Sequence, residues 1–435
     1  MKFGGSSVGN AQRIRNVTAI IKTHLDRRPV VVVSALGGIT DSLLDIATAA
    51  GTGNDTMPML EKVISVHYDT IGELSLDASI ISEEVTKLRR LVRSLSPLEQ
   101  ITPVTLDKLV SFGERMSARI VAGSLSKSGV EAHAFDAYDL GMITDSNFGN
   151  ADVLPESYQK LHDAILQKSG TLVITGFLGK SKEGRITTLG RGGSDYTASI
   201  VGAAIVAEEI QIWTDVNGIM TADPRIVKAA KSIDLVSYNE ASELAALGAK
   251  VLHPKTILPA IEKNIPVRIL NTFNPTHKGT LVQNKIDTGS RVASITYKKQ
   301  ILLMNISTRS MFKTPDFSNR VFEIFETHKI PVDLVFASEV NVSVAIDSTY
   351  NNDALIADLT KIANVQIKTN RAKVSVVGND MMRMNGVLGK MLSALKSFNI
   401  HKVSSNSSSI NQSFVVEEEN TAEVVQTLHT KFFKR

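Results

Sequence analysis

Residues 187–196 read Thr-Thr-Leu-Gly-Arg-Gly-Gly-Ser-Asp-Tyr, a β-rich end followed by glycines and then by a helix start. Ser194 or Asp195 can cap that helix, because a short polar side chain accepts hydrogen bonds from the first backbone N–H groups. Similar short β-branched runs alternate with helical spacing up to about residue 270; they cover 30–33, 171–174, 210–213 and 267–270. Helical spacing covers 59–74, 82–94, 105–127 and 155–168. This alternation predicts an α/β fold with a parallel-rich central sheet between helical layers.

A compositionally different tail follows the stretch Thr272 to Arg291, which is rich in Asn, Pro, Thr, Gly and Lys. In the tail, strand-like and helical runs follow the order βαββαβ and then repeat as βαββα. The second copy lacks its last strand, which the run 291–297 could supply, so we expect the two modules to interlock. The expected domains are 1–280, a first tail module 291–370 and a second tail module 371–435.

Composition narrows the class of protein. A chain of 435 residues is long enough for about three domains. The net charge is +4, and Lys and Arg are scattered, which does not indicate a nucleic-acid partner. Because the chain has no cysteine, disulfides, iron–sulfur clusters and thiol nucleophiles are excluded. The sequence shows neither a signal peptide nor an apolar run long enough to span a membrane, so we expect a cytoplasmic protein.

The opening run Lys2 to Gly9 places a lysine at a strand end, followed by glycines whose bare amides can surround an anion. It is not a Walker loop, because Asn10 and Ala11 stand where Lys and Ser/Thr are required. A phosphate-binding loop and a plain glycine turn both remain open.

The 187–196 stretch also contains two charged residues that could bind a ligand, Arg191 and Asp195. Arg191 can grip a carboxylate with its planar guanidinium, and Asp195 can hold an ammonium group, which together suit an amino acid. The alternative is a structural helix cap with a solvated arginine. A dinucleotide fingerprint is excluded, because Asp195 occupies the position of the third glycine.

Three further motifs have a functional and a structural interpretation. The loop from Trp213 to Arg225 could lie along a nucleotide or be an ordinary Asn-Gly turn. Lys250 could meet a phosphate or oppose a helix dipole. Glu114 could line a pocket, or it could form an exposed salt bridge on an amphipathic helix. The nine histidines show no metal-binding spacing, so we expect no protein metal site.

Taken together, the motifs closely resemble those of the aspartokinases, in order and over essentially the whole chain. The segments that carry the resemblance are Lys2–Val8, Ser34–Thr40, Phe112–Arg115, Gly176–Gly179, Thr188–Tyr196, Trp213–Gly218, Asp223–Arg225 and Gly248–Pro254. The tail resembles the paired ACT modules of that family. The resemblance implies an amino-acid-kinase fold with two ferredoxin-like βαββαβ ACT modules.

The implied reaction transfers the γ-phosphoryl group of MgATP to the side-chain carboxylate of L-aspartate, the first step toward lysine, threonine and methionine. By resemblance, Lys2 and Asp195 are catalytic, and Mg²⁺ is held mainly through the nucleotide phosphates. The implied aspartate-binding residues are Thr40, Glu114, Phe177, Arg191, Ser194 and Asp195. The implied ATP-binding residues are Lys2, Gly4, Gly5, Ser34, Gly37, Thr214, Asp215, Met220, Arg225 and Lys250.

The tail is similar to the effector site of lysine-sensitive members of the family, which form homodimers through the ACT modules and in some cases tetramers. The implied effector residues are Met311, Phe317, Ser318, Val332, Asp333, Ser338, Glu339 and Val340. Ser318 stands at a commonly apolar position, so threonine remains a rival effector. Met220 replaces a common aromatic residue beside the adenine, which predicts a thioether contact in place of stacking.

Only Met1 precedes Lys2, where the family usually carries several strand residues. A shortened first strand would anchor Lys2 poorly and reduce activity. Two alternatives therefore accompany the kinase hypothesis: a catalytically weak amino-acid sensor that keeps its ACT modules, and a sister kinase that acts on glutamate, acetylglutamate or UMP. The combination of Arg191, Ser194 and Asp195 disfavours a nucleotide acceptor, which needs no ammonium site.

Overall fold

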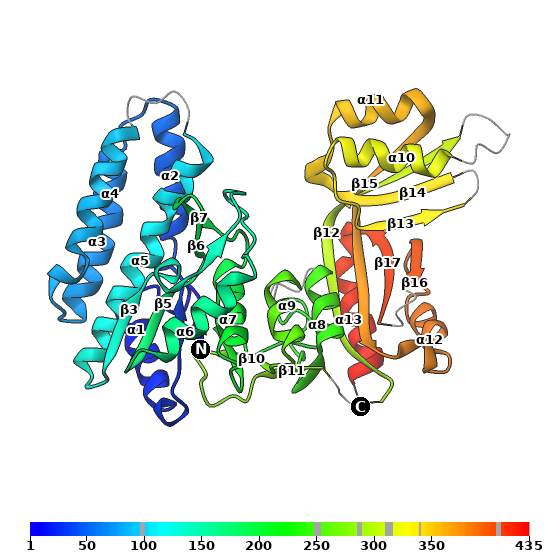
Figure 1. Cartoon of the computed structure of the whole chain (residues 1–435). Helices are drawn as coiled ribbons and strands as arrows, with labels where there is room; N and C mark the ends of the chain where they lie inside the picture. The colour runs from blue at the N-terminus through cyan, green and yellow to red at the C-terminus, as the bar shows by residue number, and fades with distance from the viewer. Residues whose placement is uncertain are drawn as a thin grey trace. The chain divides into compact units, whose positions relative to one another are not determined.

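The computed structural model describes residues 1–95, 101–247, 254–284, 289–308, 316–338, 341–405 and 410–434 (Figure 1). The chain divides into two units. The first unit comprises Met1–Ile219, Ser232–Tyr238 and Val251–Ile286. The second unit comprises Met220–Lys231, Asn239–Lys250 and Asp287–Arg435. The glycine–lysine motif around Lys250 and several tail residues lie outside the described residues.

The first unit is built on an eight-stranded sheet with the order β3-β5-β2-β1-β8-β10-β11-β9. Its strands are β1 (Lys2–Phe3), β2 (Val31–Val33), β3 (Ala132–Phe135), β5 (Thr171–Thr175), β8 (Ile210–Thr214), β9 (Leu235–Ser237), β10 (Val267–Asn271) and β11 (Thr280–Gln283). All neighbours run parallel except β10 and β11. A three-stranded sheet contains β4 (Ile143–Thr144), β6 (Leu178–Ser181) and β7 (Ile186–Thr188). The predicted parallel-rich α/β fold is therefore confirmed.

Helices cover this sheet in two layers. One layer contributes to a single apolar cluster and consists of α1 (Ala11–Lys22), α2 (Ile39–Gly51), α3 (Met57–Glu73), α4 (Ser82–Leu95) and α5 (Pro103–Lys127). The other packs around α7 (Gly193–Ala204) and includes α6 (Glu156–Leu166) and α9 (Pro254–Glu262). The helix α8 (Tyr238–Ala246) spans a boundary between the units. Short 3₁₀ turns occupy Leu25–Arg27, Ala78–Ile81, Ala137–Leu140, Ser348–Tyr350, Met381–Arg383 and Glu418–Asn420.

The first strand is short, as expected, but it is held on both sides. The Met1 amino group donates a hydrogen bond to the Val30 carbonyl at 2.7 Å, and the Ser34 N–H donates to the Phe3 carbonyl at 3.1 Å. On the other side, β1 pairs with β8, and the Phe3 ring stacks on Trp213 with the ring centroids 5.8 Å apart. Central placement therefore compensates for the two-residue length.

The second unit has a six-stranded sheet with the order β13-β14-β12-β15-β17-β16. Its elements are β12 (Arg291–Thr308), α10 (Phe317–Thr327), β13 (Leu334–Ala337), β14 (Asn341–Asp347), α11 (Asp353–Ile362), β15 (Ala363–Asn379), α12 (Val387–Ala394), β16 (Ile400–Ser405), β17 (Asn411–Glu417) and α13 (Thr421–Phe433). The long strands β12 and β15 pair antiparallel from 291 to 308, with register shifts near Ser294, Lys298 and Ile301. Both βαββ repeats therefore share these two strands.

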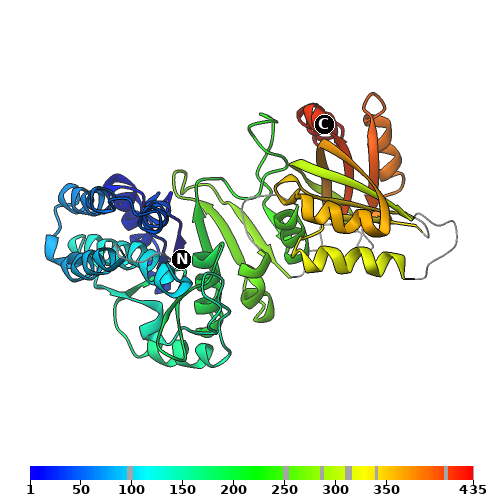
Figure 2. The ribbon, with the colours of Figure 1, turned by 90° about the horizontal axis from the view of Figure 1, so that it is seen from above.

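Each repeat has its own helical layer. One apolar cluster joins α10 and α11 to the sheet, and another joins α12 and α13 to it. In Figure 2 the two helix pairs lie on opposite sides of the strands. The ammonium of Lys402 in β16 lies 5.5 Å from the ring centroid of Phe336 in β13, although these strands are the two edges of the sheet. The sheet therefore curls, and its helix-free face encloses a small core of Ile301, Leu303, Ala345 and Val415.

Candidate active site

A cavity of about 360 Å³ lies in the first unit at the carboxyl ends of β1, β2 and β5 and at the start of α7. In open α/β sheets ligands bind at this end of the parallel strands. The predicted residues that line the cavity are Lys2, Gly5, Ser34, Gly37, Thr40, Glu114, Phe177, Ser194 and Asp195. Asp41, which sequence reasoning missed, lines it as well, one residue beyond the quoted Ser34–Thr40 motif.

Two polar contacts tie the loops around the cavity to α7. The Lys2 ammonium pairs with the Asp195 carboxylate at 2.7 Å, and both side chains are less than one-fifth exposed. The Ser34 hydroxyl donates a hydrogen bond to the Ser194 hydroxyl at 2.9 Å. The start of α7 therefore presents a lysine-bound carboxylate and a hydroxyl where the helix dipole favours negative charge.

The loop that contains Gly5 and the loop that contains Gly37 pack closely because neither glycine has a side chain. A Cβ atom on Gly5 would lie 3.2 Å from the Ala35 carbonyl oxygen, and one on Gly37 would lie 3.3 Å from the Gly5 carbonyl oxygen. Such contacts are tighter than ordinary packing, so larger residues would push the loops apart. Glycine at both positions therefore allows the two loops to lie together where they line the cavity.

The loop after β5 is strained and tightly seated. Phe177 has a φ of 68°, a left-handed conformation that costs a non-glycine residue about 1–3 kcal/mol. Its N–H donates to the Thr197 hydroxyl at 3.0 Å, which holds the turn against α7. A Cβ atom on Gly176 would lie 2.5 Å from the Ser194 side chain. Any side chain at residue 176 would therefore displace Ser194.

Glu114 is buried, so its interpretation as an exposed salt-bridge residue is wrong. The reason is that α5 passes through the interior, where Glu114 is 3% exposed and the neighbouring Arg115 is 7% exposed. One carboxylate oxygen of Glu114 accepts a hydrogen bond from the Ala35 N–H at 3.2 Å. The other oxygen is buried and has no hydrogen-bond partner within the described residues. Burial raises the pKa of Glu114 to about 8, and the hydrogen bond from Ala35 opposes this shift.

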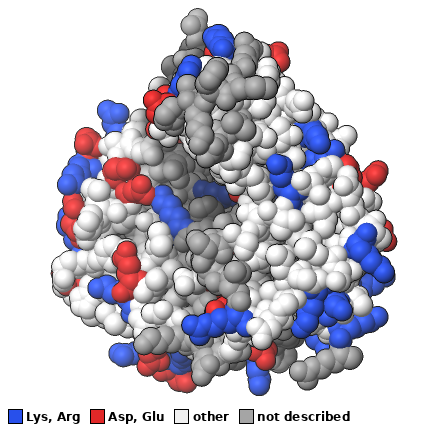
Figure 3. Space-filling view, turned by 90° about the vertical axis from the view of Figure 1, so that its right-hand side faces the viewer, with Lys and Arg blue, Asp and Glu red and all other residues white. Residues whose placement is uncertain are grey.

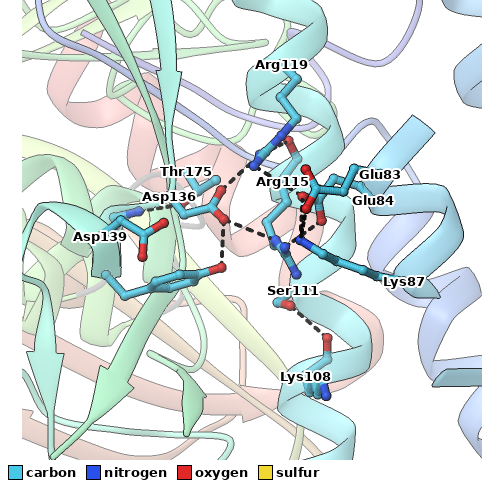
Figure 4. A network of polar contacts seen from close by, with 12 residues as sticks. Glu83, Glu84, Lys87, Lys108, Ser111, Arg115, Arg119, Asp136, Asp139 and Thr175 are labelled. Carbon is cyan, nitrogen blue, oxygen red and sulfur yellow. Dashed lines mark hydrogen bonds and ion pairs between the residues drawn. The ribbon is translucent and has the colours of Figure 1, made fainter. Parts of the chain in front are cut away.

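A buried ionic network fixes α5 beside the cavity (Figure 4). The Arg115 guanidinium contacts Glu84 of α4 at 2.6 Å and Asp136, which follows β3, at 3.1 Å. Arg119 contacts the same two carboxylates at 3.2 and 3.0 Å. The Tyr138 hydroxyl donates to Asp136 at 2.6 Å. Sequence reasoning missed this network; the available signal was a charged pair, Glu114 and Arg115, inside a largely apolar helix.

The predicted nucleotide residues are divided between the units. Thr214 and Asp215 lie at the carboxyl end of β8 in the first unit, where their side chains hydrogen-bond to each other at 3.2 Å. Met220 and Arg225 belong to the second unit, whose core includes the nearby Ala222 and Val227. The exposed Arg225 pairs with Asp223 at 2.7 Å. Gly4 lies beside Lys2, and Arg191 lies between two glycines that line the cavity.

The predicted effector residues lie around the first repeat of the second unit. Phe317 is buried in its core, Ser318 follows in α10, and Val332 packs on the same core. Asp333 pairs with Lys298 at 2.7 Å, and the buried Lys373 lies 3.9 Å from it. Ser338 donates its N–H to the Asn341 carbonyl at 2.8 Å. Met311, Glu339 and Val340 lie outside the described residues.

The other hollows and surfaces of the described chain give weaker indications of a ligand site than this cavity does. A larger hollow of about 630 Å³ lies at the amino ends of β2 and β8 and includes Met1 and Ile210, but α/β sheets bind ligands at the opposite end. Lys and Arg are interspersed with Asp and Glu on the face in Figure 3. Over the described ranges, no group of three acidic or histidine side chains could hold a metal ion. In the same part of the chain, no helix is long and apolar enough to cross a membrane.

Comparisons with known proteins identify the family. Residues 1–271 match the amino acid kinase family, and residues 374–432 match an ACT domain. Aspartokinase 1 of Arabidopsis thaliana chloroplasts is 38% identical over the whole chain, which covers 80% of that protein. The lysine-sensitive aspartokinase 3 of Escherichia coli is 34% identical, and the chain covers 98% of it.

Solved structures agree with these relatives. Escherichia coli aspartokinase III in complex with aspartate and ADP superposes with a TM-score of 0.85, at 32% identity over 100% of this chain and 99% of that one. The same enzyme in complex with lysine and aspartate gives a TM-score of 0.83 at 33% identity, with the same coverage. The architecture, the full-length similarity and the composition of the cavity lead to one assignment: the chain belongs to the aspartokinase family.

Proposed function

We propose that this chain transfers the γ-phosphoryl group of MgATP to the side-chain carboxylate of L-aspartate, giving 4-phospho-L-aspartate and ADP. The observation that carries the proposal is the cavity itself, in which an ammonium group, three acidic side chains and the start of α7 converge within about 360 Å³. The relative that superposes over the whole chain was solved with aspartate and ADP, which supports the same pair of ligands here.

In the proposed reaction, an oxygen of the ionised aspartate carboxylate attacks the γ-phosphorus. The bond from that phosphorus to the β–γ bridging oxygen breaks, and ADP leaves with the electron pair. No proton has to move, so the protein contributes position and charge. Lys2 offsets the negative charge that spreads over the transferring group, while Asp195 holds and orients the Lys2 ammonium.

The remaining residues bind the two substrates. Arg191 would pair with the substrate α-carboxylate, and Glu114 with its ammonium. Thr40, Phe177 and Ser194 would complete the aspartate pocket. The nucleotide would lie near Gly4, Gly5, Ser34, Gly37, Thr214 and Asp215 of the first unit. Contacts of the nucleotide with Met220, Arg225 and Lys250 stay predictions from the family resemblance.

Mg²⁺ would enter with ATP. The described residues offer no cluster of acidic side chains that could hold it alone, which fits a cation bound mainly through phosphate oxygens and water. When bound, the ion neutralises phosphate charge.

For the domains, we propose the boundaries 1–280, 291–370 and 371–435. Pairing of 291–298 with 373–379 supports the strand exchange between the two tail modules. We also propose that two copies of the chain form a homodimer through their ACT modules.

The decisive experiment is ATP-dependent acyl-phosphate formation with L-aspartate, trapped with hydroxylamine, with and without lysine or threonine. Turnover with aspartate supports the kinase. Lysine binding without turnover would replace it with the amino-acid sensor, and turnover only with glutamate, acetylglutamate or UMP would indicate a sister kinase.

The Arg191→Lys variant tests the substrate carboxylate site. A lysine cannot reproduce the planar, two-point contact of a guanidinium, so we expect the KM for aspartate to rise about 10- to 100-fold. The KM for ATP and kcat should change little. Steady-state kinetics with each substrate varied in turn measures both effects. Arg185→Lys, a conservative change at an exposed position in the same unit, serves as the control. An unchanged KM for aspartate would remove Arg191 from the site.

We further propose that lysine is the feedback inhibitor and that Asp333 binds its ammonium. Lys298 already contacts Asp333 at 2.7 Å, so an arriving ammonium must compete with it. Asp333→Asn should raise the lysine concentration for half-inhibition about tenfold. A change of this size corresponds to the loss of one partly exposed hydrogen bond to a charged group. Lys298→Met should lower that concentration. Uninhibited turnover should stay unchanged in both.

The matched control is Lys361→Met, which removes an equally positive but largely exposed side chain of the same module. It should leave inhibition unaltered. If Asp333→Asn and the wild type respond equally to lysine, Asp333 does not bind the effector.

A further inference from the structure

We infer that Glu114 is uncharged in the empty cavity and that it releases its proton when the substrate ammonium binds beside it. The inference rests on the proposed function, because it takes the amino group of aspartate as the ligand of Glu114. It concerns how the cavity balances charge before and after the substrate enters.

The carboxyl group of Glu114 lacks the partners that an ionised carboxylate needs. A buried carboxylate is stable only when it is paired or hydrogen-bonded at both oxygens. Here one oxygen accepts a hydrogen bond from the Ala35 N–H at 3.2 Å, and the backbone N–H of Glu114 itself also favours the charged form. The second oxygen is buried without a hydrogen-bond partner in the described structure. A proton on that second oxygen removes the cost of burying the charge.

The charged groups around Glu114 do not supply a counter-ion. Lys2 on β1 is paired with Asp195 on α7 at 2.7 Å. Arg115, the next residue on α5, is engaged by Glu84 and Asp136. Asp41 on α2, which also lines the cavity, is an exposed acid and cannot supply a positive charge.

The carboxyl groups of Asp195 and Glu114 differ in whether they already have a positively charged partner. Asp195 is already paired with the Lys2 ammonium, whereas Glu114 lines the cavity space and has one oxygen with no partner among the described residues. An ammonium group that enters this space supplies both the positive charge and the missing N–H donors. The bound state then favours the ionised carboxylate, and the displaced proton leaves to solvent.

Ionisation of Glu114 and binding of the aspartate ammonium should favour each other. Burial raises the pKa of Glu114 to about 8 in the empty cavity, and the substrate ammonium lowers it in the complex. Because the ionised form binds the ammonium, aspartate affinity should rise about tenfold per pH unit as the pH increases toward 8. Above about pH 8 this dependence should level off.

Isothermal titration calorimetry of aspartate at pH 7, in Pipes and in imidazole buffer, measures the proton directly. We expect the difference in binding heat between the buffers to report release of about 0.9 proton per aspartate. Glu114→Gln keeps the shape of the side chain and should bind more weakly with almost no proton release. Asp45→Asn, a change of an exposed acid on the same helix α2 that does not line the cavity, should release the same proton as the wild type.

The outcomes separate the inference from the proposed function. If aspartate does not bind at all, the proposed function fails and the inference fails with it. If aspartate binds with heats that do not depend on the buffer, the inference alone is overturned. The wild-type affinity measured from pH 6 to pH 9 provides a test without a variant: a rise that levels off near pH 8 supports the inference, and a flat profile contradicts it.

Discussion

Replacing Lys2 with alanine is expected to lower kcat about 10²- to 10³-fold, the usual loss when one group that stabilises transition-state charge is removed. Lys2 begins β1, one of the two central strands of the sheet, and its ammonium lies in the cavity on Asp195. It acts mainly on charge that develops during transfer, so the KM for aspartate should change much less. Steady-state hydroxylamine assays and a thermal melt of each protein measure the two effects.

The control for Lys2→Ala is Lys182→Ala, which removes the same charge from a side chain that is 63% exposed and paired with Glu156. Its kcat should match the wild type. A Lys2→Ala enzyme with wild-type kcat would exclude Lys2 from the mechanism, whereas a parallel loss of folding would show that its role is structural.

The Arg115→Ala variant should lose about 3–5 kcal/mol of unfolding free energy, the range measured when one partner is removed from a buried ion pair. Glu84 and Asp136 are both almost fully buried, and Arg119 alone would have to neutralise them. Urea denaturation followed by circular dichroism gives the free energy, provided that the transition is two-state.

A matched substitution is available on the outside of the same helical layer. Arg89 of α4 forms a two-point ion pair with Glu61 of α3, but both side chains are more than one-third exposed. Exposed pairs contribute about 0–1 kcal/mol, so Arg89→Ala should be nearly neutral. Equal losses in the two variants would mean that burial of the network around Arg115 does not matter.

The sequence predicted the architecture because its signals are local. Short β-branched runs and helical spacing depend on neighbouring residues, so the run at 31–33 became a fully buried strand and 105–127 became most of α5. Glycine turns at strand ends likewise indicated where a ligand cavity would form. These features need no knowledge of distant contacts.

The environment of individual charges could not be predicted in this way. Glu114 and Arg115 are adjacent in sequence, yet one lines a cavity and the other joins a network with residues from two other elements. Lys298 and Lys373 face each other across β12 and β15, and both lie near Asp333, which is 35 residues or more away along the chain. Such partners come from tertiary packing, which periodicity does not report.

The two long strands of the second unit have a consequence for cooperativity. β12 has 18 residues and β15 has 17, and each contributes hydrogen bonds to both repeats. Neither repeat keeps a complete sheet once the other is cut away, because the cut would remove a central strand from both. A slip by one residue would also turn core side chains outward in both repeats at once. The two repeats are therefore one folding unit that cannot be transplanted or truncated repeat by repeat.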